Sequence, residues 1–264
     1  MNLQSLELGI LLPALLAGML VLATHVPLGQ QVLNRGIVFI DLAIAQVAGL
    51  GVTAASALGF EAEGWRVQVA AVGAALIGAL LLTFTEKIWP EVQEALIGVL
   101  FVVAACIELL LLANNPHGGE HLKDLLVGQI LWVSPEKLIP VAILYAVALA
   151  AWFGLRQRLG QVGFYVLFAL VVTQSVQLVG IYLVFASLIV PALAARRYAE
   201  RLRLPVGYGV GLAGYLLGLV ASSLFDLPTG AVIVVALLVV FVLVALAAHF
   251  APRDARADAS TRAV

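Results

Sequence analysis

The sequence predicts an all-α fold, a polytopic bundle of transmembrane helices. Of the 264 residues, 63% are hydrophobic and only 11% are charged, whereas about 25% of the residues in a soluble domain are charged. The mean hydropathy is +1.11, and the apolar residues form runs long enough to cross a bilayer. So few charges cannot cover a soluble globule of 27.8 kDa. A soluble enzyme, a nucleic-acid-binding protein and a disordered scaffold are therefore excluded.

Charges, prolines and glycines divide the apolar sequence into eight or nine predicted spans, because about 20 helical residues cross the hydrocarbon layer. The run 159–195 has no charged residue and is too long for one span. We divide it near Thr173–Gln177 into two short spans. Residues 1–251 form the predicted transmembrane domain, and residues 252–264 a disordered cytoplasmic tail. The other predicted spans are 8–30, 36–60, 67–85, 95–113, 138–155, 204–225 and 229–249.

Lysine and arginine residues predict the orientation, because they concentrate on the cytoplasmic side of membrane proteins. With nine spans and an external N-terminus, the predicted outer segments hold only Arg66, Lys123 and Lys137. The C-terminus is then cytoplasmic. The predicted cytoplasmic segments hold Arg35, Lys87, Arg156, Arg158, Arg196, Arg197, Arg201, Arg203, Arg253, Arg256 and Arg262.

The longest predicted outer loop, 114–136, contains a half-apolar stretch that is too short to cross the membrane. We expect this stretch, Leu122–Val133, to form a re-entrant or interfacial helix. The loop also contains metal-binding side-chain types within eight residues, a composition suited to a divalent transition metal. A helix N-terminus carrying solvent-exposed histidines explains the same residues equally well. These residues are His117, Glu120, His121 and Asp124.

Two acidic residues lie inside predicted spans. A charge there costs about 2.5–3.5 kcal/mol on insertion scales and is a functional candidate. Asp41 lies near the cytoplasmic end of the second span. It is either a first-turn acid favoured by the helix dipole or a residue on a substrate path. Glu108, toward the outer end of the fourth span, is either a helix-contact acid or a ligand. His25 and His249 are predicted to be interfacial.

A basic segment follows the seventh predicted span and is suited to docking a partner protein. Small residues there lead into four arginines within eight residues, on the predicted cytoplasmic side. Ordinary positive-inside charge is the alternative interpretation. No glycine precedes any lysine, so the chain has no phosphate-binding Gly-Lys-Ser/Thr loop. The chain therefore uses an ion gradient or a motor in another subunit. The candidate docking residues are Pro191, Ala195, Arg196, Arg197, Arg201 and Arg203.

Several segments resemble the integral-membrane permeases of the zinc/manganese/iron family of ABC importers. The resemblance implies a homodimer in a bacterial cytoplasmic membrane, with the pathway between the subunits. It also implies cytoplasmic ATPase subunits that use ATP, an extracytoplasmic metal-binding protein, and a coupling helix at Pro191–Arg203. The chain itself would bind no cofactor and would carry zinc or manganese, with zinc ahead. The segments are Pro27–Gly29 with Asn34–Arg35, Asp41–Gly51, Leu125–Gly128 with Val133–Glu136, Gly180–Arg197 and Phe225–Ala231.

One departure from that family affects the metal site. Its members typically carry an Asp and a His four residues apart in the second span. Here Ala45 stands four residues after Asp41, and Gln46 aligns with the His. On a regular helix Asp41 and Gln46 lie about 140° apart, so we predict a π-bulge that returns both to the pore face. Glu108, His117, Glu120 and His121 are the further candidate metal ligands.

Two other functions stay open at this point. A permease for a metal chelate such as a siderophore, haem or cobalamin would need no histidine, because the substrate brings its own ligands. An ion-coupled secondary transporter could use Asp41 and Glu108 as proton or cation sites, but it leaves the basic docking segment unexplained.

Overall fold

The computed structural model describes residues 8–60, 64–112 and 118–250, and these residues are helical with no strand among them. Eight helical segments are long and apolar enough to cross a membrane, and one further apolar helix is shorter. The helices are α1 (Leu8–Arg35), α2 (Ile40–Ala57), α3 (Trp65–Ile88), η2 (Pro90–Val92), α4 (Gln93–Leu112), α5 (Gly118–Val127), η3 (Ile130–Trp132), α6 (Pro135–Val179), α7 (Ile181–Ala195), α8 (Glu200–Phe225) and α9 (Thr229–Phe250). The predicted all-α polytopic bundle is confirmed.

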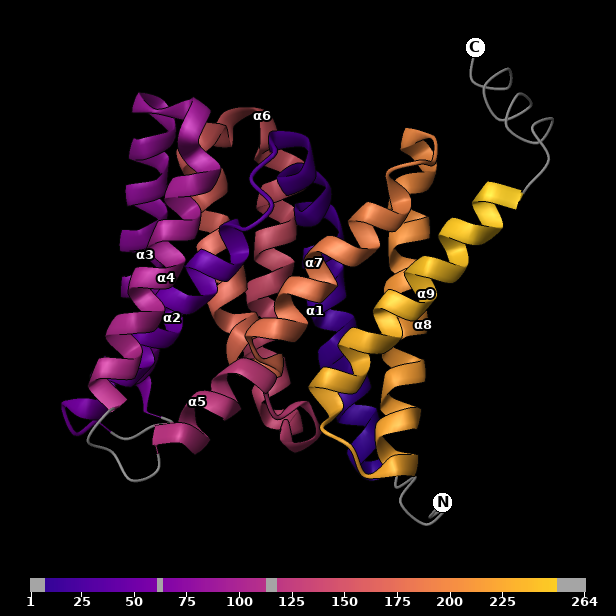
Figure 1. The fold of residues 1–264 in the computed structure, drawn as a ribbon, viewed down its shortest axis with the longest axis horizontal. Coiled ribbons are helices and arrows are strands. Elements are labelled where there is room, and N and C mark those ends of the chain that lie inside the picture. The colour runs from indigo at the N-terminus through magenta and orange to yellow at the C-terminus, as the bar shows by residue number, and fades with distance from the viewer. Residues whose placement is uncertain (1–7, 61–63, 113–117, 251–264) are drawn as a thin grey trace.

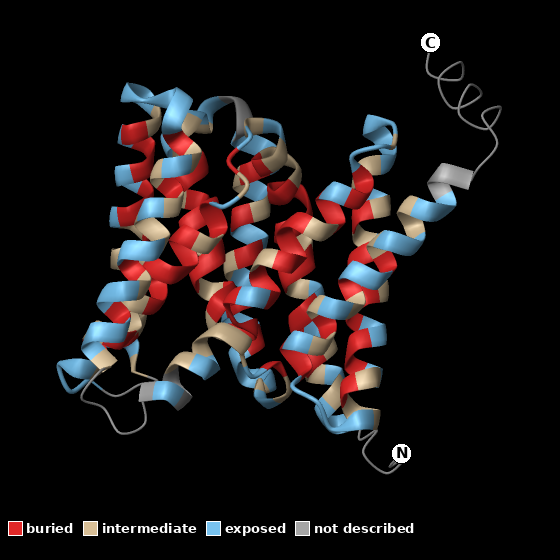
Figure 2. Ribbon diagram, viewed as in Figure 1, coloured by how far each residue is buried: buried red, intermediate tan, exposed pale blue. Residues whose placement is uncertain are grey.

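The helices form three groups side by side (Figure 1). On one side α2 packs against α3 and α4, and on the other side α8 packs against α9. Between them α1 contacts α6, α7 and α8. Buried residues concentrate in this centre, whereas the outer faces of α3, α4 and α9 are exposed (Figure 2). Those faces carry large apolar side chains such as Ile77, Leu110 and Leu243, as expected of surfaces that contact lipid.

The long uncharged run divides at different places from those predicted. α6 contains two spans joined at Gly160, which has non-helical backbone angles, and it continues to Val179. The predicted break at Thr173–Gln177 is therefore wrong. Polar residues there are accommodated within the helix: the Ser175 hydroxyl donates to the Val171 carbonyl, and the Gln177 side chain accepts a bond from Gln68 of α3. The break falls at Gly180, whose φ is 81°.

A short helix is confirmed in the loop that the charges predict to be external, although its bounds differ from the predicted ones. α5 covers Gly118–Val127 and is followed by the single turn η3. It lies across the end of the bundle where α1 begins (Figure 1). Helix order places Arg66, Lys123 and Lys137 at this end. Most of the described basic residues, among them Lys87 and the arginines between α7 and α8, lie at the opposite end. We call this the basic end of the bundle.

Three distant segments meet where α5 ends. Gly128 and Gly180 have φ values of 72° and 81°, and a Cβ on either would overlap backbone atoms of the other segment. A Cβ at Gly230, in the first turn of α9, would overlap the carbonyl oxygen of Val127. Backbones can approach this closely only without a side chain. We call this contact of α5, the α6–α7 break and α9 the glycine junction. The predicted C-terminal tail lies outside the described residues.

Candidate functional site

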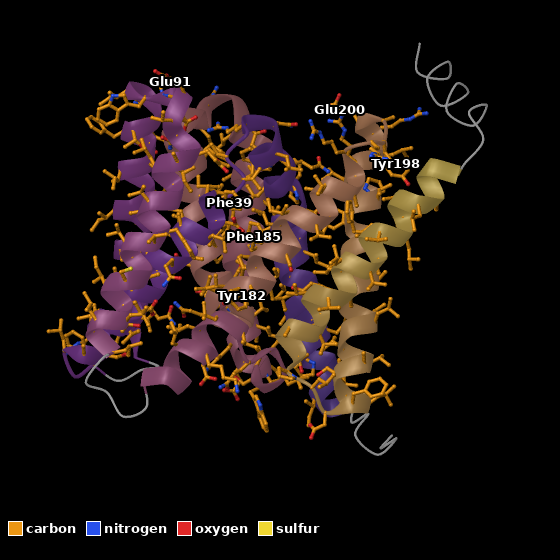
Figure 3. The ribbon with its side chains drawn as sticks, in the orientation of Figure 1. Phe39, Glu91, Tyr182, Phe185, Tyr198 and Glu200 are labelled. Atoms are coloured by element: carbon orange, nitrogen blue, oxygen red, sulfur yellow. The ribbon has the colours of Figure 1, made fainter. Side chains whose placement is uncertain are left out.

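The start of α2 lies inside the bundle rather than at its end. Phe39, the residue before α2, lies beside Phe185 of α7, well below Glu91 and Glu200 at the basic end (Figure 3). The connection from α1 enters the core, because Ile37 within it is 4% exposed. Asp41, in the first turn of α2, consequently lies deeper than its predicted position near the end of the span.

Asp41 is the least satisfied acidic residue of the described chain. Its exposed fraction is 0%, and no side chain among the described residues donates a hydrogen bond to either carboxylate oxygen. A buried carboxylate without a partner is unfavourable by several kcal/mol unless it is neutral or meets a cation. The positive end of the α2 dipole is too weak to offset this cost by itself. The position thus favours a proton or a cation at Asp41.

Aromatic and polar contacts tie the start of α2 to two other helices. The rings of Phe39 and Phe185 stack with centroids 6.2 Å apart and an interplanar angle of 10°. The backbone N–H of Phe39 donates to Oε1 of Glu94 in α4 at 3.3 Å. Sequence reasoning missed these residues, because no local pattern marks aromatic or acidic partners more than 50 residues apart. The backbone beside Asp41 is thus in contact with both α4 and α7.

The predicted π-bulge is wrong. α2 is α-helical throughout, and on such a helix Asp41 and Gln46 point in directions about 140° apart. Gln46 is 2% exposed, and its Nε2 donates to Oε2 of Glu108 in α4. The amide has a partner on its own side of the helix, so nothing draws it toward Asp41.

Glu108 is buried as a helix-contact acid. It is 1% exposed, and the Thr53 hydroxyl donates to its Oε1 at 2.8 Å. A Cβ at Gly49 would lie 3.7 Å from the same oxygen, so the carboxylate lies against the bare backbone of α2. We call Gln46, Thr53 and Glu108 the Glu108 cluster. Thr53 follows Gln46 by seven residues on the same helix face, a spacing from which it could have been predicted.

The described residues contain no group of three or more His, Cys, Asp or Glu side chains that could hold a metal ion. His117 lies outside the described residues. Glu120 and His121 lie in α5, but their side chains, like that of His249, are outside the described part. The prediction for His25 is wrong: its exposed fraction is 0%, and its Nδ1 lies 2.9 Å from the Val21 carbonyl oxygen. α6, α7 and α8 surround α1 and exclude the imidazole from the surface.

The basic segment forms a helix end, a turn and a helix start. Pro191 lies within α7, which ends at Ala195, and α8 begins at Glu200. No separate coupling helix occurs in this described segment. The Nε of Arg203 donates to the Tyr198 carbonyl at 3.3 Å and closes the turn. Arg196, Arg197 and Arg201 are exposed, as a docking surface requires.

The sequence matches the ABC 3 transport family over residues 7–164 and 149–248. The chain belongs to the ABC-3 transport family. This match includes the start of α2, the Glu108 cluster, the glycine junction and the turn between α7 and α8. The family is a transport family rather than a catalytic one, and its match agrees with the missing phosphate-binding loop.

Two curated relatives of this ABC-3 protein are similar in sequence. The "Manganese transport system membrane protein MntC" of Halalkalibacterium halodurans is 27% identical over 95% of this chain and 90% of its own length. The "Probable iron transport system membrane protein" of Haemophilus influenzae is 31% identical over 48% of this chain, and that match spans about half of the relative, 55%.

Two solved structures share the fold. PsaBC from Streptococcus pneumoniae in complex with Fab has a TM-score of 0.72 and 22% identity, over 89% of this chain and 90% of that one. An inward-facing transporter described as metal-chelate type ABC has a TM-score of 0.64 and 18% identity, over 89% of this chain and 85% of that one. At these identities the likeness concerns the fold.

Proposed function

We propose that this ABC-3 protein is the permease subunit of an ATP-driven importer of a divalent transition-metal ion. The two curated relatives, named for manganese and iron transport, support this proposal. The observation that carries it is Asp41, a fully buried carboxylate with no side-chain hydrogen-bond partner among the described residues, at a helix start inside the bundle. Ionisable residues inside membrane bundles mark substrate and ion pathways.

A weak site suits a transported ion. A path must bind the ion well enough to admit it but loosely enough to release it. One carboxylate, completed by water or by carbonyl oxygens, meets this requirement better than a closed set of four protein ligands. The transported ion is the substrate here, and no resident cofactor is proposed for the chain.

Manganese is the substrate that these groups suit best. Carboxylate, carbonyl and water oxygens are typical ligands of Mn²⁺, whereas imidazole and thiolate favour zinc. Asp41 offers carboxylate oxygen atoms, and neither relative above is named for zinc. We therefore place manganese ahead of iron and zinc, which reverses the order expected from the sequence. The zinc prediction stays untested.

The proposed mechanism is alternating access in a homodimer. α7 connects the glycine junction at one end of the bundle with the arginine-bearing turn at the other. ATPase subunits docked at Arg196, Arg197, Arg201 and Arg203 would move this turn, and α7 would transmit the movement to Phe39 and α5. An extracytoplasmic metal-binding protein would deliver the ion at the α5 end. The C-terminus is then cytoplasmic in a bacterial cytoplasmic membrane.

Metal accumulation tests the proposal. In a source strain lacking the gene and starved in turn for manganese, iron and zinc, we expect wild type to restore cellular manganese and Asp41→Asn to restore less than a tenth of it. The amide keeps the shape of the carboxylate but loses its charge. Cellular metals are measured by mass spectrometry, and membrane levels of each variant by immunoblot.

Glu91→Gln is the matched control, because Glu91 is exposed at the basic end and should transport normally. Full uptake by Asp41→Asn at equal membrane levels would remove Asp41 from the path. Unchanged metals in every starvation condition would reject metal-ion import and favour a chelate. Co-purification of an ATPase subunit separates both ABC functions from an ion-coupled transporter.

A further inference from the structure

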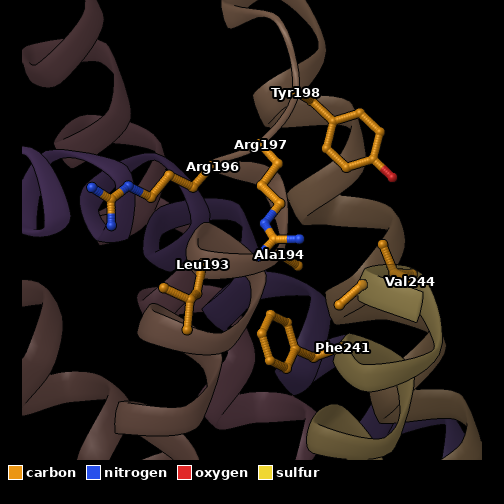
Figure 4. A pocket seen from close by; sticks show the side chains of 8 residues that line it. Leu193, Ala194, Arg196, Arg197, Tyr198, Phe241 and Val244 are labelled. Atoms are coloured by element: carbon orange, nitrogen blue, oxygen red, sulfur yellow. The ribbon is translucent and has the colours of Figure 1, made fainter. Parts of the chain in front are cut away.

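A cavity of about 290 Å³ lies between the turn after α7 and the last turns of α9 (Figure 4). One wall consists of Arg196, Arg197 and Tyr198. The other wall is apolar and consists of Leu193 and Ala194 of α7 with Phe241, Val244 and Ala245 of α9. The cavity thus combines strong cationic donors with a hydrocarbon surface.

The Arg197 side chain points from the turn into this cavity. It runs toward Phe241, whereas Arg196 extends away from α9 (Figure 4). No hydrogen bond or ion pair joins the Arg197 guanidinium to any residue that the structure describes. Arg197 is exposed, so a ligand from outside the chain can reach its guanidinium. A guanidinium beside an apolar helix without an acidic partner indicates an anionic ligand from outside the chain.

The cavity lies toward the C-terminal end of α9, at the end of the bundle that the basic residues assign to the cytoplasmic surface. α9 runs to Phe250 without an Asp, Glu, Lys or Arg, and the cavity residues Val244 and Ala245 lie in its last two turns. Beside the cavity-lining residues of α9 lie exposed apolar residues, among them Val242, Leu243 and Leu246. An anion held at Arg197 would therefore lie directly above a surface fit for acyl chains.

We propose that this cavity binds the headgroup of an anionic phospholipid, with its phosphate on Arg197 and its acyl chains along α9. A lipid supplies both the negative charge and the apolar chain that the two walls require. An acidic segment of a cytoplasmic ATPase would satisfy the arginine but would leave the apolar wall exposed. Basic pockets between spans at the cytoplasmic side bind anionic lipids by the same physics. This inference is independent of the transported substrate, and it assigns Arg197 to the lipid while Arg196, Arg201 and Arg203 stay with the proposed ATPase contact.

The test is ligand-dependent thermal stability of the purified full-length chain in detergent. We expect dioctanoyl phosphatidylglycerol to raise the unfolding temperature of wild type, and dioctanoyl phosphatidylcholine or inorganic phosphate to leave it unchanged at equal concentration. Arg197→Gln should raise the half-saturating concentration of phosphatidylglycerol about tenfold, because a charge-assisted bond to the phosphate is lost. Ala245→Leu should weaken the lipid similarly by filling the apolar side.

Arg201→Gln is the matched control. Arg201 is exposed at the same end of the bundle but does not line this cavity, so its loss should leave the half-saturating concentration within twofold of wild type. If Arg197→Gln and Arg201→Gln weaken phosphatidylglycerol binding equally, the effect is one of general surface charge and the proposal is overturned. Equal stabilisation by phosphatidylcholine would overturn it too, as would an equal response to phosphate alone. If no lipid changes the unfolding temperature, the lipid proposal is rejected and an acidic protein segment becomes the favoured ligand of the cavity.

Discussion

At the scale of single residues, α2 carries two buried polar side chains, Asp41 and Gln46, that differ in their hydrogen bonding. Gln46 and Glu108 satisfy each other across two helices, and Thr53 completes the pair. Asp41, on another face, is left without a side-chain partner among the described residues. A polar group paired in this way supports the fold, whereas an unpaired one is stable only with a proton or an ion. This difference separates the structural polar residue from the proposed functional one.

We predict that Gln46→Leu lowers the stability of the chain by about 1–3 kcal/mol, because the buried Glu108 carboxylate loses a donor. The double variant Gln46→Leu with Glu108→Leu should recover most of this loss, since apolar groups then replace both partners. The unfolding temperatures of the two single variants and the double variant in detergent give the coupling energy.

Thr83→Val is the control for this cycle. Thr83 is also buried, but its hydroxyl donates to the Ala79 carbonyl of its own helix, so its replacement should cost little. Additive effects of Gln46→Leu and Glu108→Leu would contradict the proposed pairing.

At the scale of the elements, one glycine decides where α6 ends. Gly180 takes a φ of 81°, a conformation that other residues adopt only at a cost. The break lets α7 start next to Gly128 instead of continuing the line of α6. Its 15 residues then lead to the basic turn. The path of α7, on which the proposed coupling depends, follows from this single break.

Gly180→Ala should therefore destabilise the protein by more than about 2 kcal/mol, because the strained φ and the overlap with Gly128 add to each other. We expect a lower unfolding temperature and a smaller folded fraction on size-exclusion chromatography. Gly73→Ala, in the interior of α3 with no neighbouring atom within 4 Å of the new Cβ, is the control. It should be neutral or stabilising by up to about 1 kcal/mol. Equal behaviour of the two variants would disprove the role of the junction.

At the scale of the whole molecule, basic residues cluster at one end of the bundle. Helix order places the turn between α7 and α8 at the end opposite α5 (Figure 1). The positive-inside rule assigns the basic end to the cytoplasm. The orientation is thus a prediction from charge applied to an observed topology.

Single cysteines test this orientation. Cys106 is the only cysteine, so Cys106→Ser provides a background in which Gly119→Cys in α5 or Ala199→Cys in the basic turn is unique. We expect a membrane-impermeant maleimide to label position 119 in right-side-out vesicles, and position 199 only after the vesicles are opened. If only position 199 is labelled in sealed right-side-out vesicles, the predicted orientation is wrong and the basic end faces outward.

Hydropathy and charge were enough to predict the bundle, most span limits and the helix in the outer loop, because lipid imposes the length and apolar surface of every span. The candidate positions Asp41 and Glu108 were visible for the same reason: a charge within a span is rare.

Only the tertiary structure decided which polar groups are paired. No local pattern around Gln46 indicates that its amide bonds to Glu108, which lies 62 residues away in the sequence. Without that partner, a π-bulge that turns Gln46 toward Asp41 was a reasonable prediction. His25 was placed at the surface because the sequence does not reveal that three helices surround α1. The glycine junction likewise joins segments about 50 residues apart. Local physics therefore determined the elements, whereas contacts between distant helices determined the partner, burial and role of each polar residue.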